Sequence, residues 1–191
     1  MTTTTPECVN HLPGWLSPAE ADALFETLIR DIPWEQKAIR MYGRETAVPR
    51  LTSWFGDVGY TYSGTTNAAH AWLPELEDLR ARLETTTTAR FNSCLANLYR
   101  DGHDSVSWHA DDEPELGPEP IIGSVSLGST RDFKIRNEAT SEIATIPLGH
   151  GDLVVMRGES QADYRHSVPK RAHADARINL TFRHYTERKR P

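Results

Sequence analysis

The sequence is poor in cysteine and in long apolar runs. Cys8 and Cys94 are its two cysteines, too few for a disulfide framework and without the paired spacing of a zinc or redox motif. No apolar run approaches the about 20 residues that cross a bilayer. The first fifteen residues lack both the basic start and the continuous apolar stretch of a secretory signal. We therefore expect a soluble, cytoplasmic protein that does not contact a membrane.

An excess of positive charge is also absent, since the formal net charge is -6. Non-specific affinity for nucleic acid comes mainly from clustered Lys and Arg, so this charge is a mild argument against a broad grip on phosphate backbones. The segment from Arg183 to Arg190 is locally basic, which leaves a nucleic-acid contact open. A solvated basic tail is the alternative interpretation of that segment.

Length and composition predict one domain. A chain of 191 residues with 38% hydrophobic residues is long enough for one substantial core, and no internal break indicates a second. We expect a single domain over residues 1–191, with 1–15 as a partly flexible extension, and a monomer.

Helical periodicity occurs twice in the N-terminal half. Ser17 to Glu20 resembles a capping box before Ala21 to Ile29, where apolar residues recur at helical spacing. A second helix is expected over Glu75 to Glu84, ended by the threonine tract Thr85 to Thr88, because its apolar face carries Leu76, Leu79 and Leu83.

From Phe91 onward, short strand-like runs alternate with Gly, Pro and Asp. This spacing predicts an α+β, mainly β fold: a double-sheet jelly roll with one sheet buttressed by the two N-terminal helices. The expected strands are Phe91–Tyr99, Val106–Ala110, Ile121–Leu127, Asp132–Arg136, Ile143–Pro147, Asp152–Met156 and Ile178–His184.

A metal site is indicated by His109 and Asp111, since residues two apart in a strand face the same way. His166, in a segment after the Gly151-Asp152 turn, is the strongest candidate for a third ligand. Two histidines and one carboxylate leave octahedral positions open, as an Fe(II) centre that binds a co-substrate and dioxygen requires. An isolated His-x-Asp pair is weak evidence for a metal site. The alternative interpretation is that these residues form an exposed polar strand end. Alternation turns Asp112 away from this face.

The run from Arg177 to Arg183 places polar side chains on one face and Ile178, Leu180 and Phe182 on the other. Two guanidiniums beside a cation site need an anion to balance them, and a dicarboxylate fits because Arg binds carboxylates bidentately. Solvent-exposed arginines on an edge strand are the alternative. Asn97 and Tyr99 can point into the same interior, although a strand Tyr is more often ordinary packing.

Together these residues resemble the AlkB family of Fe(II)/2-oxoglutarate dioxygenases. The motifs follow the family's order between about Pro33 and His184, as Asn97-Leu98-Tyr99, Trp108 to Glu113, His166 and Arg177 to Arg183. The chain is most similar to animal-type members that demethylate alkylated bases in single-stranded DNA and RNA, through residues 32–34, 60–63 and 101–113. The resemblance implies a double-stranded β-helix fold.

The resemblance also implies roles for individual residues. Iron would be bound by His109, Asp111 and His166. Arg183 would pair with the distal carboxylate of 2-oxoglutarate, in a pocket completed by Asn97, Tyr99, Arg177 and Asn179. Tyr62 matches an aromatic residue that stacks on the flipped base, with Tyr60 and Trp34 nearby and Asp112 as a polar group beside the base. Core packing is the alternative for these aromatic residues, Trp34 above all.

The implied activity uses Fe(II), O2 and 2-oxoglutarate to remove N-methyl groups from 1-methyladenine and 3-methylcytosine, releasing formaldehyde, succinate and carbon dioxide. Blocked pairing would ease extrusion of such a base. Two alternatives stay open. The same chemistry could act on a protein side chain or a small metabolite, which the acidic charge would tolerate better, or the protein could read methylated nucleic acid without turnover.

Overall fold

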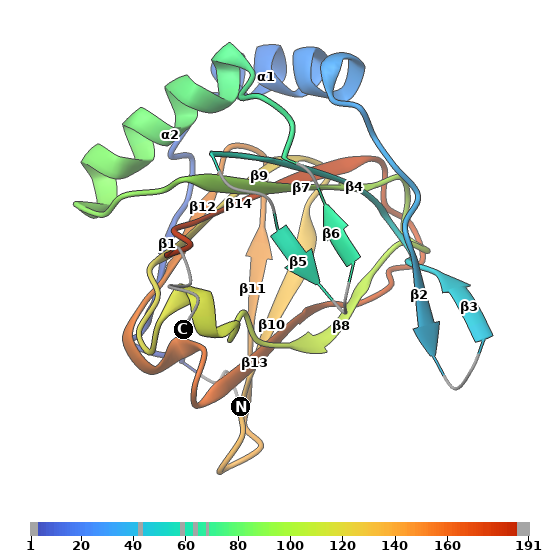
Figure 1. The fold of residues 1–191 in the computed structure, drawn as a ribbon. Helices are drawn as coiled ribbons and strands as arrows, with labels where there is room; N and C mark the ends of the chain where they lie inside the picture. The colour runs from blue at the N-terminus through green and yellow to red at the C-terminus, as the bar shows by residue number, and fades with distance from the viewer. Residues whose placement is uncertain (1–3, 42–43, 58–59, 63–64, 68, 187–191) are drawn as a thin grey trace, which may run out of the picture.

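Two antiparallel sheets lie face to face and enclose part of the core (Figure 1). The computed structural model describes residues 4–41, 44–57, 60–62, 65–67 and 69–186, with the backbone alone at 39–41, 44–45, 60–62 and 65–67. The larger sheet has the order β1 (Val9–Leu12), β12 (Leu153–Met156), β9 (Ile122–Gly128), β14 (Arg177–Arg183), β7 (Ser93–Tyr99) and β4 (Leu51–Gly56). The smaller sheet has the order β11 (Ile143–Leu148), β10 (Arg131–Asn137), β13 (Tyr164–Val168) and β8 (Val106–His109).

Two small two-stranded sheets and two short 3-10 helices complete the described elements. The first small sheet pairs β2 (Ala38–Met41) with β3 (Arg44–Ala47) and projects from the side of the body (Figure 1). The second pairs β5 (Tyr60–Tyr62) with β6 (Thr65–Asn67). The 3-10 helices span Pro114–Leu116 and Gly158–Ser160.

Helix α1 (Pro18–Asp31) begins at the predicted capping box. The Ser17 hydroxyl accepts from the backbone N–H of Glu20, and the Glu20 carboxylate accepts from the backbone N–H of Ser17. Both bonds satisfy donors that a helix start leaves unpaired. The helix continues two residues beyond the predicted Ile29.

Helix α2 (Pro74–Thr87) runs through most of the threonine tract that was expected to end it. The hydroxyls of Thr85, Thr86 and Thr87 each donate to the carbonyl four residues earlier. The tract therefore bonds within the helix instead of competing with it. The helix ends at Thr88, which adopts a left-handed conformation with φ 56°.

Both helices cover the outer face of the larger sheet, as Figure 1 shows. Leu28 of α1 and Leu83 of α2 are fully buried against β-strand residues such as Val125 and Ile178. Leu83 lies directly over Gly123, where an added Cβ would come within 2.4 Å of its side chain. The absence of a side chain at Gly123 thus lets α2 approach the sheet.

The predicted architecture is confirmed: a mainly β, α+β fold of two antiparallel sheets with the helices buttressing one of them. The seven expected strands are present with ends shifted by one or two residues. The sequence prediction missed β1 to β6 and β13. Four residues assigned to an N-terminal extension, Val9–Leu12, instead pair with β12 at the edge of the larger sheet.

Both cysteines are buried free thiols. Cys94 packs among the residues beneath the helices, and Cys8 packs between the two sheets. Burial raises the pKa of each thiol above its ordinary value. Among the described residues, neither helix is long and apolar enough to cross a membrane. The cytoplasmic location, the single domain and the monomeric state stay predictions.

Candidate active site

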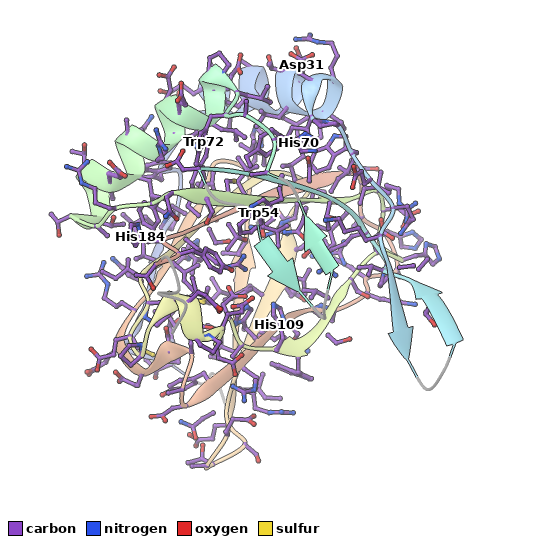
Figure 2. The ribbon with its side chains drawn as sticks, viewed as in Figure 1. Asp31, Trp54, His70, Trp72, His109 and His184 are labelled. Carbon is purple, nitrogen blue, oxygen red and sulfur yellow. The ribbon has the colours of Figure 1, made fainter. Side chains whose placement is uncertain are left out.

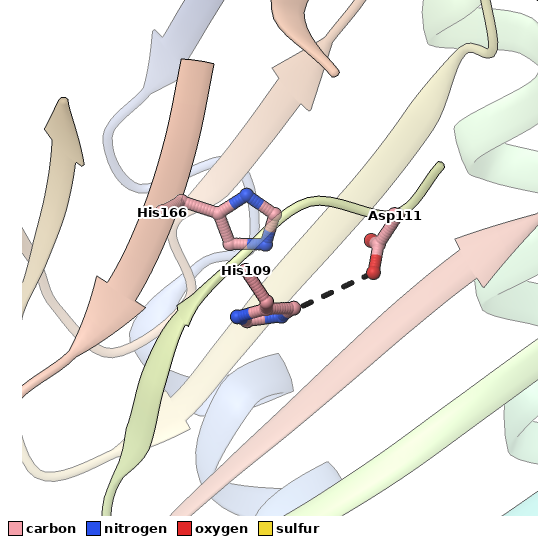
Figure 3. A group of neighbouring side chains, drawn as sticks. All are labelled: His109, Asp111 and His166. Carbon is pink, nitrogen blue, oxygen red and sulfur yellow. Dashed lines mark ion pairs between the residues drawn. The ribbon is translucent and has the colours of Figure 1, made fainter. Parts of the chain in front are cut away.

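Strand pairing brings the two candidate histidines together. His109, the last residue of β8, lies opposite His166 of β13 in the smaller sheet. Their ring centroids are 4.2 Å apart, and the two rings lie side by side (Figure 3). The Nδ1 atom of His109 lies 2.8 Å from the Ser107 carbonyl oxygen. If Nδ1 carries the proton, this contact leaves Nε2 free as a ligand atom.

Asp111 completes the group from a loop, because β8 ends at His109. Strand alternation therefore does not place this carboxylate, contrary to the expectation from sequence. The backbone N–H of Asp111 donates to Gln161 Oε1 at 2.9 Å, which fixes the loop. The Asp111 Oδ1 atom lies 4.0 Å from His109 Nε2 (Figure 3). Ligand atoms of the three residues lie within 4.8 Å of one another, the one such group among the described residues.

Arg183 anchors the Asp111 carboxylate from the opposite sheet. Its Nε and Nη2 atoms bind the two carboxylate oxygens at 3.1 and 2.8 Å, and both side chains are buried. Burial by itself raises the pKa of Asp111, but Arg183 and the two histidines outweigh it and lower the value to about 2. The carboxylate is thus ionised and oriented, as a metal ligand must be.

His166 is held in its neutral form. Burial, followed by the nearby His109 and opposed by Asp111, lowers its pKa to about 3. A neutral imidazole is the form that binds a metal ion. The donor set of two imidazoles and one carboxylate therefore fits a divalent ion such as Fe(II), with further octahedral positions open.

A polar cavity extends from these ligands along the inner face of the larger sheet. The alternation predicted for β14 is confirmed, since Ile178, Leu180 and Phe182 pack toward the helices while the polar residues face inward. Asn179 Nδ2 donates to Ser124 Oγ at 2.7 Å. The polar lining beyond the three candidate ligands comprises Arg50, Asn97, Tyr99, Ser124, Arg177, Asn179, Thr181 and Arg183.

Arg177 is a buried cation of this cavity and has hydrogen-bond donors without partners. Its side chain is 1% exposed, and Nη2 donates to Ser126 Oγ at 2.9 Å. Within the described part of the chain, its Nε and Nη1 atoms have no hydrogen-bond partner. An unpaired buried donor is costly, so this guanidinium is suited to an incoming anion. Arg183, by contrast, already has its carboxylate in Asp111.

Among the residues expected to hold the substrate base, the structure describes the side chains of Trp34 and Asp112, and it does not bring these two together. Trp34 packs against the cluster beneath the helices, on the other side of the larger sheet from the cavity, and its Nε1 donates to the Ile29 carbonyl. Asp112 is exposed and lies 3.9 Å from Arg165. The side chains of Tyr60 and Tyr62 lie outside the described residues.

Sequence reasoning missed two polar residues that support the site. Arg50 lines the cavity and donates to Asn97 Oδ1 at 2.7 Å. Gln161 is buried and accepts from Asp111, as described above. Neither lies in a periodic pattern with the ligands, because each reaches the site from a separate segment. No local signal marks them.

A two-histidine, one-carboxylate group inside a double-stranded β-helix defines a class of protein, the mononuclear iron oxygenases. A model of the 2OG-Fe(II) oxygenase superfamily matches residues 8–183. Alpha-ketoglutarate-dependent dioxygenase alkB homolog 3 of Mus musculus is 46% identical over 185 residues, covering 90% of this chain and 64% of the relative. DNA oxidative demethylase ALKBH2 of Homo sapiens is 37% identical over 179 residues, covering 86% and 69%.

The chain belongs to the AlkB family of 2OG-Fe(II) oxygenases. It spans less than two thirds of the length of the alkB homolog 3 proteins it matches. Solved structures agree in fold. OsALKBH1 has a TM-score of 0.66 at 15% identity, covering 95% of this chain and all of that one. A prolyl hydroxylase from Trichoplax adhaerens has a TM-score of 0.64 at 10% identity, covering 92% and 83%.

Proposed function

We propose that the protein is an oxidative demethylase of N-alkylated nucleic acid that uses Fe(II), O2 and 2-oxoglutarate. The carrying observation is the group of partly exposed His109 with buried Asp111 and His166, beside a guanidinium with unpaired donors. Similarity to proteins named as oxidative demethylases supports the choice of substrate. The proposed lesions are 1-methyladenine and 3-methylcytosine in single-stranded DNA or RNA.

His109, Asp111 and His166 would hold Fe(II). When bound, the metal with its co-substrate supplies the oxidising power that hydroxylates an N-methyl carbon, and the hydroxymethyl base then loses formaldehyde. The chain's own contribution is orientation. Gln161 fixes the Asp111 backbone, and burial between the sheets holds the Asp111 and His166 side chains away from water, while His109 stays partly exposed.

We assign the distal carboxylate of 2-oxoglutarate to Arg177 in place of Arg183. A bidentate carboxylate would satisfy the donors that Arg177 leaves unpaired. Arg183 instead orients the ligand Asp111 through two hydrogen bonds. Asn97, Tyr99 and Asn179 share the cavity with Arg177 and would complete the co-substrate pocket.

For the substrate base, Tyr60, Tyr62 and Asp112 stay proposals. Trp34 is given the alternative role of core packing, since it lies against the helix-side cluster. Figure 2 shows His109 away from the helices, and we propose that a base enters at its partly exposed side chain. Asp112 follows the ligand Asp111 directly and is exposed there.

A basic surface on the outer face of the smaller sheet supports binding of a phosphate backbone. Arg136 and Arg165 lie directly opposite each other on β10 and β13, although like charges in register repel. Arg136 also lies over the Trp108 ring, 4.8 Å from its centroid. Both arginine side chains are about one third exposed, at 33% and 31%. Glu138 and Asp112 pair with Arg136 and Arg165, and a polyanion would replace or add to these contacts.

The variant Arg136→Gln is expected to weaken binding of a methylated single-stranded oligonucleotide and to reduce the salt slope of its affinity by about 0.7, one phosphate contact. The matched control is Arg30→Gln on α1, where Arg30 binds the neighbouring Asp31 much as Arg136 binds Glu138. Fluorescence anisotropy over a range of salt measures both. Equal salt slopes of affinity for the two variants would show that Arg136 does not contact the oligonucleotide.

The test of the proposed function is formaldehyde release and base restoration from a single-stranded oligonucleotide with one 3-methylcytosine, given Fe(II), ascorbate and 2-oxoglutarate. We expect release from the methylated strand and none from an unmethylated strand of the same sequence. An RNA version of the strand compares the two nucleic acids. If 2-oxoglutarate were converted to succinate without base restoration, the assignment as an oxygenase would stand. The assignment of nucleic acid as the substrate would be refuted, in favour of a protein side chain or a metabolite.

A further inference from the structure

Arg131 is a fully buried arginine outside the cavity. It is the first residue of β10, in the smaller sheet, and has 0% exposure. Its Nη1 donates to the Asp101 carbonyl at 3.1 Å, and its Nη2 donates to the carbonyls of Asp104 and Pro169 at 2.8 and 2.7 Å. The guanidinium thus ties two loops to the end of the sandwich where the larger sheet carries Tyr99 and Arg177.

Tyr99 connects Arg131 to the proposed co-substrate pocket. The Arg131 guanidinium lies 5.5 Å from the centroid of the Tyr99 ring, and that of Arg177 lies 5.2 Å from the same centroid. Tyr99 and Arg177 are direct partners across β7 and β14. Both distances are within the range of a cation–π contact, which is stronger when desolvated. One ring is therefore held by two buried cations.

No carboxylate among the described residues hydrogen-bonds the Arg131 side chain. The nearby Asp104 carboxylate binds Arg100 instead, at 2.7 and 2.8 Å. Three backbone carbonyls and the Tyr99 ring surround the Arg131 cation. Its Nε atom has no hydrogen-bond partner among the described residues. Burial lowers its pKa, opposed by Tyr99, but an arginine stays protonated in a protein. Asp104 and Asp101 stabilise the Arg131 charge from a distance, and a bound anion would add to that stabilisation for both buried cations.

We propose that Arg131 is a positioning residue for the distal carboxylate of 2-oxoglutarate. It holds the Tyr99 ring against Arg177 and adds a second buried positive charge behind the end of the pocket. This inference rests on the proposed function, because it takes 2-oxoglutarate as the ligand. Arg131 does not itself line the cavity, so its effect passes through Tyr99 and the field of its charge.

The test compares two 2-oxo acids that differ at one end. 2-Oxopentanoate has the carbon chain of 2-oxoglutarate with a methyl group in place of the distal carboxylate. Dissociation constants for both are measured by calorimetry on the Mn(II)-loaded protein, where no turnover occurs. In Arg131→Met we expect 2-oxoglutarate to bind about tenfold more weakly, the effect of one weakened hydrogen bond to a charged group, and 2-oxopentanoate to bind as in wild type.

The control is Arg171→Met. Arg171 is exposed and donates to the Thr130 carbonyl beside Arg131, and its variant is expected to bind both acids as wild type does. A merely structural Arg131 would weaken both acids equally, and that result overturns the inference. If Arg131→Met does not fold, Arg131→Lys gives the same comparison, with a smaller selective loss expected. A wild-type protein that binds neither acid refutes the proposed function itself.

Discussion

The variant His166→Ala is expected to lose demethylation by about a thousandfold or more, since a bound metal supplies several kcal/mol of stabilisation and 1.36 kcal/mol corresponds to tenfold in rate. His166 is 6% exposed and lies beside His109, so no other described imidazole can take its place. Formaldehyde release measures the rate, and metal content after anaerobic loading measures the site. Both are expected to fall together.

The matched control is His173→Ala, a change at an exposed histidine in the loop before β14. It should leave rate and metal content unchanged. Thermal unfolding of each variant separates loss of the site from loss of the fold. A folded His166→Ala protein that retained full metal content and turnover would refute the assignment of this residue as a ligand.

The variant Arg177→Met is expected to raise the KM for 2-oxoglutarate by about a hundredfold, because removing one partner of a buried charge pair costs about 2–5 kcal/mol. Its guanidinium has two donors without described partners, and the co-substrate carboxylate would use them. Metal affinity should change little, since Arg177 has no contact with the ligands among the hydrogen bonds described. Initial rates over a range of 2-oxoglutarate measure the effect.

Arg183→Met distinguishes the two arginines. Because Arg183 binds both oxygens of Asp111, its loss should weaken metal binding first, and 2-oxoglutarate binding as a consequence. If Arg177→Met reduced metal affinity while Arg183→Met raised only the KM, the roles would be exchanged and the sequence-based assignment of Arg183 restored.

The site shows where strand periodicity suffices. Alternation along Arg177–Arg183 predicts which residues face the interior, and the structure confirms it because the strand is buried on both faces. Periodicity does not predict which of the two arginines, Arg177 or Arg183, forms an ion pair within the protein. Arg183 meets Asp111 across the sandwich, a contact that depends on the loop after β8 and on the distance between the sheets. Only the packed structure contains that information.

Other features had no signal in the sequence. In the sequence, Arg131 looks like an ordinary charged residue at the start of a strand. Its side chain can be buried because backbone carbonyls from distant segments accept its hydrogen bonds. Strand β13 is short and mixes polar with apolar residues, so its pairing with β8 and β10 was not foreseen. Trp34, an aromatic residue beside a motif, is partly buried against the cluster beneath the helices, which favours the core-packing alternative that the sequence left open.

The burial of both thiols has a practical consequence. Cys94 is inaccessible and Cys8 nearly so, at 0% and 7% exposure, and their raised pKa values keep them protonated. Protonated, buried thiols react slowly with alkylating reagents. The folded protein therefore behaves as one without native labelling sites. A cysteine introduced on the surface would carry a fluorophore or spin label specifically, so distances to a bound strand could be measured without altering the natural sequence elsewhere.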